Sequence, residues 1–537
     1  MNRVRHLRMY DLHSWTGLAI GLLIYIVVFT GCVALFHAEL ESWEDPAKRL
    51  SVASSPVAIN TAVADWVDEK AADGEVSFLG VYGPTVHNPY FYAFMNVTEA
   101  EGETNSHEVR WNTSTGAVLP KRGDGLVHWL VQFHTDLMWP TALGGRIVGR
   151  TLVGIIGIAL LLSIVSGVII HTKIREEFFS LRYLRSVRLK WQDTLKILGL
   201  WLLPFYGMIS FTGAFLGVLA LLVPIVAVLA FKGDQEALIE AVLGPQEEAT
   251  GVAAQMLSID TAFSITHPRT DIEPRIILVE NWGDEAATYD LLYEAQTELA
   301  LYDTATVSGV TGEVIKDSST NTLSRGGRTT YSIAPLHYGT FGGIWLKGFY
   351  FVLGLSLAVV TATGLMMWTE RRLHGNEGQR TAKFYQRLSR ANVGVIMGLP
   401  IASAVIFYLD KVYAGPEGAR LAWTGWVYFI AWFAVLGYAI RQVNEYKSVR
   451  QLMALLGALL VGIPFTNIAA TGDLFLLSLG SGTDWAWADL IFLLSGILTV
   501  FIARTLPAKR PEKKSKKRRA AKQEAEPSVP PHAAPAE

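Results

Sequence analysis

The stretch Val127-His-Trp-Leu-Val-Gln-Phe-His134-Thr-Asp-Leu137 organises the rest of this chain, because it runs into an apolar span at about 146–170. It predicts a transmembrane helix with histidines at both ends, His128 and His134 at the entry and His171 at the exit. Other predicted helices also carry histidines at their ends: His13, His37 and His337. A single histidine of this kind can be an interfacial side chain. A set at both membrane faces indicates two metal or haem sites stacked across a bilayer.

The composition excludes a soluble globular protein. Of 537 residues, 51% are hydrophobic and 18% charged. Uncharged runs such as 198–230 exceed the roughly 20 residues that cross a bilayer. The single cysteine, Cys32, excludes disulfides, iron–sulfur clusters and covalent C-x-x-C-H haem attachment within the chain. Any haem is therefore non-covalent and held by histidine. Tails and loops indicate no nucleic-acid module, and lipid is the surrounding partner.

The fold class that we predict is a polytopic α-helical membrane protein. Its eight expected spans lie at approximately 14–36, 146–170, 197–231, 342–368, 393–412, 421–440, 450–470 and 486–504. Lysine and arginine gather at the N-terminus, in alternate loops and in the tail, so the positive-inside rule puts both termini in the cytoplasm. The N-terminal apolar run is too long for a signal peptide, and we expect an uncleaved anchor.

This span pattern divides the chain into seven parts. They are 1–39, the first helix; 40–125 and 232–335, two small α+β domains on the outside; 126–231, two helices with a cytoplasmic loop; 336–372, the fourth helix; 393–504, a C-terminal four-helix extension; and 505–537, a basic disordered tail. The outer segments contain aromatic and β-branched runs typical of strands, at 76–82, 90–97 and 275–280. Each segment closes with a predicted hairpin turn at a glycine, Gly116 or Gly312.

The unit of span, outer domain and span occurs twice in the sequence. Residues 11–17 followed by Thr30-Gly31 match residues 193–199 followed by Thr212-Gly213. The stretches that end in His134 and His337 also match, so the outer-face histidine occurs in both halves. The inner-face histidines, His13 and His171, occur only in the first half, where the second half has Leu195 and Trp368.

This distribution groups the histidines into two predicted bis-histidine haem b sites. His13 and His171 would hold an inner haem, and His134 and His337 an outer haem between the halves, because such a haem needs one ligand on each face of the iron. His37, just past the first span, is an alternative to His134 as the outer ligand. Interfacial side chains are the alternative interpretation of all five histidines.

Three cations lie at the outer starts of the second and fourth spans: Arg146, Arg150 and Lys347. They would pair with haem propionates or with an anionic ligand. Interfacial cations whose charged ends reach water are the alternative. His128 precedes His134 by six residues and should point to another side of the helix.

The motifs resemble a known family. Leu12-His13-Ser-Trp-Thr-Gly17, the two Thr-Gly pairs, Leu336–Gly343 and Gly364–Trp368 are similar to the PepSY-associated transmembrane family, which includes iron-regulated membrane proteins and ferric-siderophore reductases of Gram-negative bacteria. The resemblance covers residues 1 to about 372. It implies a bacterial inner-membrane protein with PepSY-like periplasmic domains and two haems b, held by His13, His134, His171 and His337. The extension at 393–504 departs from the family's four-span pattern and would be an electron-input module or a docking site.

We therefore expect a transmembrane electron-transfer protein with ferric-chelate reductase activity on a ferric siderophore during iron uptake. Its electrons would come from a quinol or a separate membrane reductase, because no G-x-G-x-x-G fingerprint follows a predicted strand. Two alternatives remain at this point. One is a membrane-anchored sensor, or a module that binds a ligand or a peptidase, without redox activity. The other is a siderophore or metal transporter, against which the scarcity of mid-span charges counts.

Overall fold

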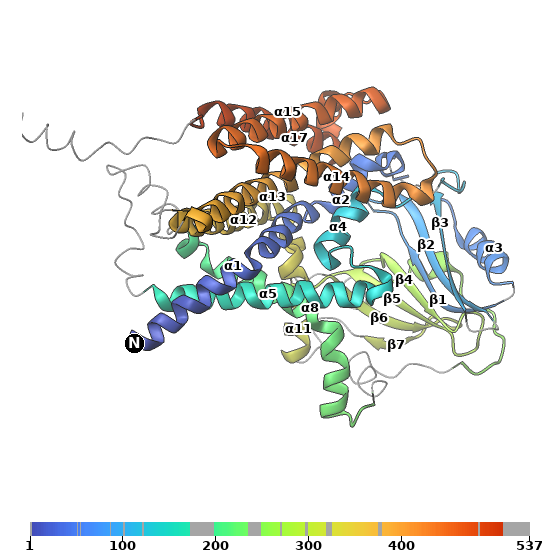
Figure 1. Ribbon diagram of the computed structural model, residues 1–537. Coiled ribbons are helices and arrows are strands. Elements are labelled where there is room, and N and C mark those ends of the chain that lie inside the picture. Colours follow the sequence, from blue (N-terminus) through green and yellow to red (C-terminus); the bar gives the residue numbers. More distant parts are fainter. Residues whose placement is uncertain are drawn as a thin grey trace, which may run out of the picture.

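The computed structural model describes residues 3–171, 198–234, 249–317, 325–373, 379–481 and 484–508, apart from short gaps at 51, 54, 73, 86, 100–102, 121–122, 269–270 and 296–298. The predicted cytoplasmic loop after His171 and most of the predicted tail lie outside these residues. In the described part, long helices lie side by side and a β-sheet covers one end of them (Figure 1).

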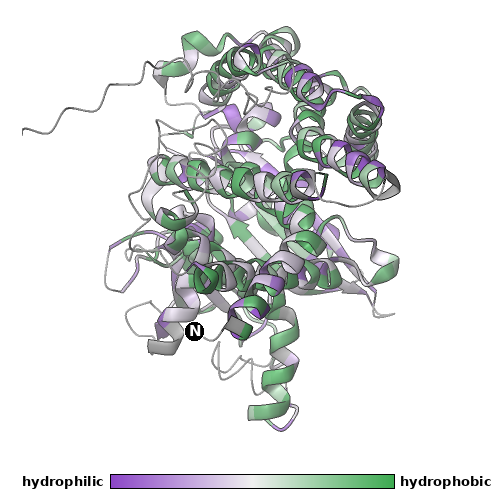
Figure 2. Cartoon of the chain, turned by 60° about the vertical axis from the view of Figure 1, so that its left-hand side comes forward, coloured by the Kyte–Doolittle hydropathy of each residue, from purple (hydrophilic) through white to green (hydrophobic). Residues whose placement is uncertain are grey.

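Eight long helices form the larger part of the molecule. They are α1 (Arg3–Ala34), α5 (Gly145–Ile170), α8 (Leu203–Ala230), α12 (Gly343–Leu373), α13 (Gln379–Val412), α14 (Arg420–Arg441), α15 (Glu445–Thr471) and α17 (Asp484–Thr505). Among the described residues, seven are apolar and long enough to cross a membrane, and α8 qualifies as a bent pair. Their surfaces expose large hydrophobic side chains such as Trp345, Leu229 and Phe433. Hydrophobic residues predominate along these helices (Figure 2). Such a surface suits lipid, so the chain is a polytopic helical membrane protein.

The third predicted span is a helix with a sharp bend. Its two parts, Leu203–Leu219 and Pro224–Ala230, meet at an angle of 78°. Pro224 lies at the break, where its ring removes a backbone donor and clashes with the preceding turn. Helices α1 and α13 begin about eleven and fourteen residues before the predicted spans, because their polar first turns continue the helix beyond the apolar part.

The two outer segments form one sheet instead of two separate domains. Its seven strands have the order β3-β2-β1-β4-β5-β6-β7 and all neighbours are antiparallel. The strands are β1 (Gly74–Tyr82), β2 (Tyr90–Glu99), β3 (Thr104–Asn112), β4 (Ile276–Glu280), β5 (Thr288–Glu294), β6 (Tyr302–Ser308) and β7 (Val314–Asp317). The strands predicted at 76–82, 90–97 and 275–280 are confirmed as β1, β2 and β4. Pairing of β1 with β4, from Leu79↔Val279 to Tyr82↔Ile276, joins the two segments.

Two helices that pack on this sheet join the halves a second time. They are α3 (Asn60–Lys70) and the short α10 (Ile259–Phe263), and their side chains share one core with the strands. The Asp260 carboxylate accepts hydrogen bonds from the backbone N–H groups of Ile59 and Asn60, at 2.8 and 2.9 Å. In return, Asn60 Oδ1 accepts from the Ile259 N–H at 2.8 Å. Each helix therefore caps the other.

The predicted hairpin glycines are confirmed. Gly116 has φ = 69° and Gly312 has φ = 76°, in the left-handed region that a side chain would strain. Gly312 lies in the turn between β6 and β7, and Gly116 precedes the bridge that Val118 makes with Trp111.

The histidines of the opening stretch do not flank one continuous helix, and that prediction is wrong. His128 and His134 lie on a separate short helix, α4 (Leu126–Asp136), which a 3₁₀ turn (Thr141–Leu143) divides from α5. Positive φ values at Leu137 and Met138 end α4. The second half repeats this design: α11 (Arg325–Tyr338) ends at Gly339 with φ = 65°, and a 3₁₀ turn leads into α12. His134 and His337 are thus carried by matching short helices outside the candidate spans.

The C-terminal extension shares a hydrophobic core with the rest of the membrane part. Side chains of α13, α14, α15 and α17 pack in one cluster with α1, α4, α12 and the short helix α2 (His37–Glu44). The four helices are therefore not a separate domain.

Candidate functional site

His134 and His337 face each other from the two halves of the repeat. Their ring centroids are 6.3 Å apart and their planes differ by only 15°. Rings packed face to face have centroids about 4 Å apart, so the 6.3 Å separation is too wide for a face-to-face stack. It does match a metal between them: two metal–imidazole bonds of about 2 Å, plus about 1 Å from each nitrogen to its ring centre, span about 6 Å. The spacing fits a bis-histidine iron site.

Each ring lies against a glycine of the neighbouring span. A Cβ atom at Gly31 of α1 would lie 2.7 Å from His134 Cε1, and one at Gly213 of α8 would lie 2.9 Å from His337 Cε1. These glycines belong to the two Thr-Gly pairs of the repeat. Any side chain at either position would displace the histidine, so the pairs make room for imidazole rings.

The Nδ1 atom of each ring is hydrogen-bonded, which fixes its tautomer. His134 Nδ1 lies 3.0 Å from the Val27 carbonyl oxygen, which can only accept, so Nδ1 carries the hydrogen. His337 Nδ1 lies 3.0 Å from Thr212 Oγ1, and that hydroxyl donates to the Met208 carbonyl at 2.9 Å. Thr212 therefore accepts from His337. In both rings the Nε2 lone pair is left for a metal, the usual arrangement of a metal-binding histidine.

Burial keeps both imidazoles neutral. It lowers the pKa of His134 below its ordinary value. Burial, reinforced by the nearby His134 ring, lowers the pKa of His337 to about 3. Neutral imidazole is the form that binds metal ions and haem iron.

A cavity of about 710 Å³ adjoins the two histidines. Helices α1, α5, α8 and α12 line it, mostly with apolar side chains, which is the size and character of a cofactor pocket. The three cations from the sequence analysis, Arg146, Arg150 and Lys347, and also His37, border the same cavity. Lys347 is paired with Glu39 at 2.7 Å, and Arg146 lies 3.4 Å from Asp136.

His13, the first of the inner pair, repeats the same seating on another helix. Its Nδ1 donates to the Ser163 carbonyl of α5 at 2.9 Å, and its Cε1 lies 3.2 Å from the Cβ that Gly167 would carry. His171 is the residue that closes α5. Ser163 and Gly167 lie one turn apart on the face of α5 that meets His13, and His171 follows directly after the helix ends. The structure thus places His13 against the last turns of α5, the helix that His171 closes.

The other histidines have different surroundings. His128 lies 3.6 Å from Asp124, with 39% of its side chain exposed, and points away from the pair. His37 Nδ1 bonds the Ala34 carbonyl of its own chain turn at 3.2 Å. His6 Nε2 lies 3.1 Å from the Ile170 carbonyl oxygen, next to His171. Trp368, the counterpart of His171, packs against Tyr385 and beneath Arg372 instead.

Sequence reasoning missed the partners of the histidine rings. It used Gly31 and Gly213 as markers of the repeat but did not connect either with an imidazole. Thr212 and the carbonyls of Val27 and Ser163 were also missed. The repeated Thr-Gly pair was the available signal, since its position one helix away from a repeated histidine already suggested a contact.

Comparison with known proteins places the chain. A family model described as the PepSY-associated TM region matches residues 10–371. The chain belongs to this family. It is also 24% identical over 333 residues to an uncharacterized protein of Pseudomonas aeruginosa. The aligned region covers 60% of this chain and 83% of that protein. The extension formed by α13 to α17 lies beyond the matched family region.

Proposed function

We propose that this chain is a transmembrane electron-transfer protein that reduces a ferric siderophore, or a similar ferric chelate, at the membrane face that carries the sheet. The proposal includes haem b between His134 and His337, and a second haem b between His13 and His171. The observation that carries it is the facing pair of His134 and His337, at metal-bridging distance with both Nε2 atoms left free of hydrogen bonds in the described residues.

The residues present fit such a cofactor. When bound, haem supplies a one-electron Fe(III)/Fe(II) couple. The chain would hold it through two neutral imidazoles, orient those rings through Val27 and Thr212, and exclude water with the apolar walls of the cavity. Arg146 and Arg150 are suited to the carboxylates of its propionates, because guanidinium groups bind carboxylates in two-point contacts.

Helix α1 connects the two proposed sites. It presents His13 at one end, and it offers Val27 and Gly31 to His134 near the other. Residues 13 and 27 are 14 positions apart, which corresponds to about 21 Å along a helix. One rigid helix would therefore fix the separation between an inner electron acceptor and an outer donor.

The substrate follows from iron chemistry. Siderophores bind Fe(III) tightly and Fe(II) weakly, so transfer of one electron to the chelated Fe(III) gives Fe(II) and releases the metal. The electron would come from a quinol or from a separate membrane reductase. We propose that the protein resides in the bacterial inner membrane, with the sheet in the periplasm and both termini in the cytoplasm.

The first test is a visible spectrum of the detergent-purified protein, oxidised and then reduced with dithionite, together with a pyridine haemochrome count. We expect two haems b per chain with sharp reduced bands. His134→Ala or His337→Ala should remove one of them. A colourless protein from haem-replete cells would exclude the proposed function.

Two glycines of α1 provide a matched comparison. Gly31→Leu would fill the space of the His134 ring, and the outer haem should be lost. Gly17→Leu changes the same helix one turn from His13, at a position with no neighbour within 4 Å of the added Cβ, and the outer haem should remain. Retention of the outer haem in Gly31→Leu would contradict a ligand role for His134.

A further inference from the structure

The extension packs against the helix that carries His134. Three large side chains of α4 are buried there, with Trp129 and Leu130 at 1% exposure and Phe133 at 4%. The Trp129 ring lies 4.2 Å from that of Tyr428 of α14, centroid to centroid. Phe133 meets Tyr428 and Trp432 edge to face, at 5.5 and 6.2 Å. An aromatic surface of α14 thus supports α4.

The same helix is also held at its N-terminus. Glu44 of α2 accepts hydrogen bonds from the Leu126 and Val127 N–H groups, both at 2.9 Å, through its two carboxylate oxygens. Arg420 of α14 closes over this cap: a Cβ at Gly125 would lie 2.5 Å from Glu44 Oε1 and 2.7 Å from Arg420 Cδ. Arg420 in turn donates to Asp410 of α13 at 3.0 Å. A carboxylate at a helix N-terminus satisfies otherwise unpaired donors and complements the helix dipole.

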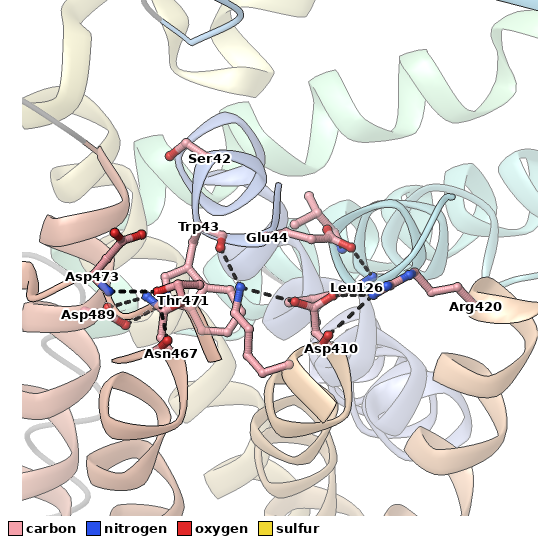
Figure 3. A network of polar contacts seen from close by, with 12 residues as sticks. Ser42, Trp43, Glu44, Leu126, Asp410, Arg420, Asn467, Thr471, Asp473 and Asp489 are labelled. Carbon is pink, nitrogen blue, oxygen red and sulfur yellow. Dashed lines mark hydrogen bonds and ion pairs between the residues drawn. The ribbon is translucent and has the colours of Figure 1, made fainter. Parts of the chain in front are cut away.

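The extension is bonded to α2, the helix that supplies this cap, through a buried polar network (Figure 3). Trp43 Nε1 donates to Asp489 of α17 at 2.7 Å, and Asn467 of α15 donates to the other Asp489 oxygen at 2.7 Å. Lys411 of α13 donates to the Trp43 carbonyl at 2.8 Å and lies 3.9 Å above the indole ring. Trp43, Asn467 and Asp489 are fully buried. A satisfied buried network of this kind holds one arrangement of its members.

The second half of the repeat has no such support among the described residues. By the alignment of His134 with His337, Ser332 of α11 occupies the position of Trp129. Tyr331 and Tyr338 of α11 are 38% and 46% exposed. The extension therefore covers only one of the two short histidine helices.

We propose that the C-terminal extension holds α4 in place, and that Tyr428 and Glu44 are positioning residues that fix His134 relative to His337. That α4 carries a haem ligand rests on the proposed function, whereas the packing of the extension against α4 does not.

The test uses the full-length protein and two kinds of α14 variant. Tyr428→Ala removes the ring beneath Trp129. Gly425→Ala adds a Cβ 2.9 Å from Trp129 Nε1 and pushes on it. Two variants of the same helix are matched controls: Trp426→Ala, whose side chain is 66% exposed, and Gly437→Ala, which has no neighbour within 4 Å.

Hydrogen–deuterium exchange of the α4 amides provides a readout that does not need haem. We expect exchange over residues 126–136 to rise at least about tenfold in Tyr428→Ala and to change in Gly425→Ala, with no change in either control. In haem-loaded protein, the midpoint potential of one haem should shift in Tyr428→Ala and Gly425→Ala alone.

Unchanged α4 exchange in both Tyr428→Ala and Gly425→Ala would overturn the proposal that the extension holds α4 in place. Faster α4 exchange with both haem potentials unchanged would overturn the positioning of His134. A protein that binds no haem would overturn the proposed function. The exchange comparison would still decide whether α14 holds α4 in place.

Discussion

Thr212 is the side chain that accepts a hydrogen bond from one of the two outer histidines, His337. The two outer histidines are held differently: His134 donates to a backbone carbonyl, and His337 donates to a hydroxyl. Thr30, the counterpart of Thr212, donates to the carbonyls of Ile26 and Val27 on its own helix. The repeat therefore supplies two threonines in matching positions, of which only one contacts an imidazole.

We predict that Thr212→Val weakens haem retention at the outer site about tenfold and shifts its midpoint potential, because the hydrogen bond from Nδ1 orients the ring and raises its basicity. Thr212→Ser should restore both properties. Haem titration and a potentiometric titration of the purified protein measure the two effects.

Thr30→Val is the control. It replaces the hydroxyl at the corresponding helix position by a methyl group without removing a hydrogen-bond partner of either histidine ring. Equal shifts in Thr30→Val and Thr212→Val would show that the hydroxyl acts on helix packing and not on His337.

At this scale the sequence predicted the pairing but not its details. Recurrence of His134 and His337 in both halves indicated that they share a site, because a duplicated position retained in both copies is under one constraint. Which atoms the rings contact could not be predicted. A Thr-Gly pair shows that a residue is small and its neighbour polar, and only packing decides which ring occupies the space.

Among the elements, the break between α4 and α5 shows where periodicity fails. The apolar pattern continues through both helices, yet Leu137 and Met138 adopt positive φ, a conformation that their residue types rarely favour. Pro140 and the pair Gly144-Gly145 were visible in the sequence as breakers, and their neighbourhood is the correct boundary. The consequence is functional, because a separate α4 can be oriented by α14 independently of the span that follows it.

A second contact between elements predicts a pH dependence. His87, in the loop between β1 and β2, lies 2.7 Å from Asp484 at the start of α17. The hydrogen bond to Asp484 raises the pKa of His87, assisted by the charge of Glu39 and opposed by burial and by Lys347. Because the folded-state pKa is raised, this contact stabilises fully below the unfolded pKa, near 6.5, and its contribution is lost as the pH rises through the folded value.

We predict that thermal stability falls more steeply between pH 6 and 8.5 in the wild type than in His87→Gln, by an amount below about 1 kcal/mol because the imidazole is 45% exposed. Melting curves of both proteins across this pH range measure it. Parallel curves would mean that His87 does not tie the sheet to α17.

For the molecule as a whole, hydropathy and charge predicted the spans, and residue type predicted the strands, but the single sheet was not predictable. Strand β1 pairs with β4 across about 200 residues of intervening chain, and no local pattern encodes a register between segments that far apart. The duplication favoured two copies of a small domain, whereas the edge strands of the two copies pair with each other and leave fewer open edges.

The sheet must lie on one side of the membrane and the loop between α14 and α15 on the other, if the charge distribution sets the orientation. Two valines of similar exposure test this: Val118 beside β3 is 67% exposed and Val443 between α14 and α15 is 81% exposed. The only native cysteine, Cys32, is buried, so the wild type serves as the unlabelled control. We predict that Val118→Cys reacts with a membrane-impermeant maleimide in intact spheroplasts, and that Val443→Cys reacts only after lysis. The reverse pattern would put the sheet in the cytoplasm and with it the site at which the outer histidines meet their substrate, which would exclude a ferric chelate arriving from outside.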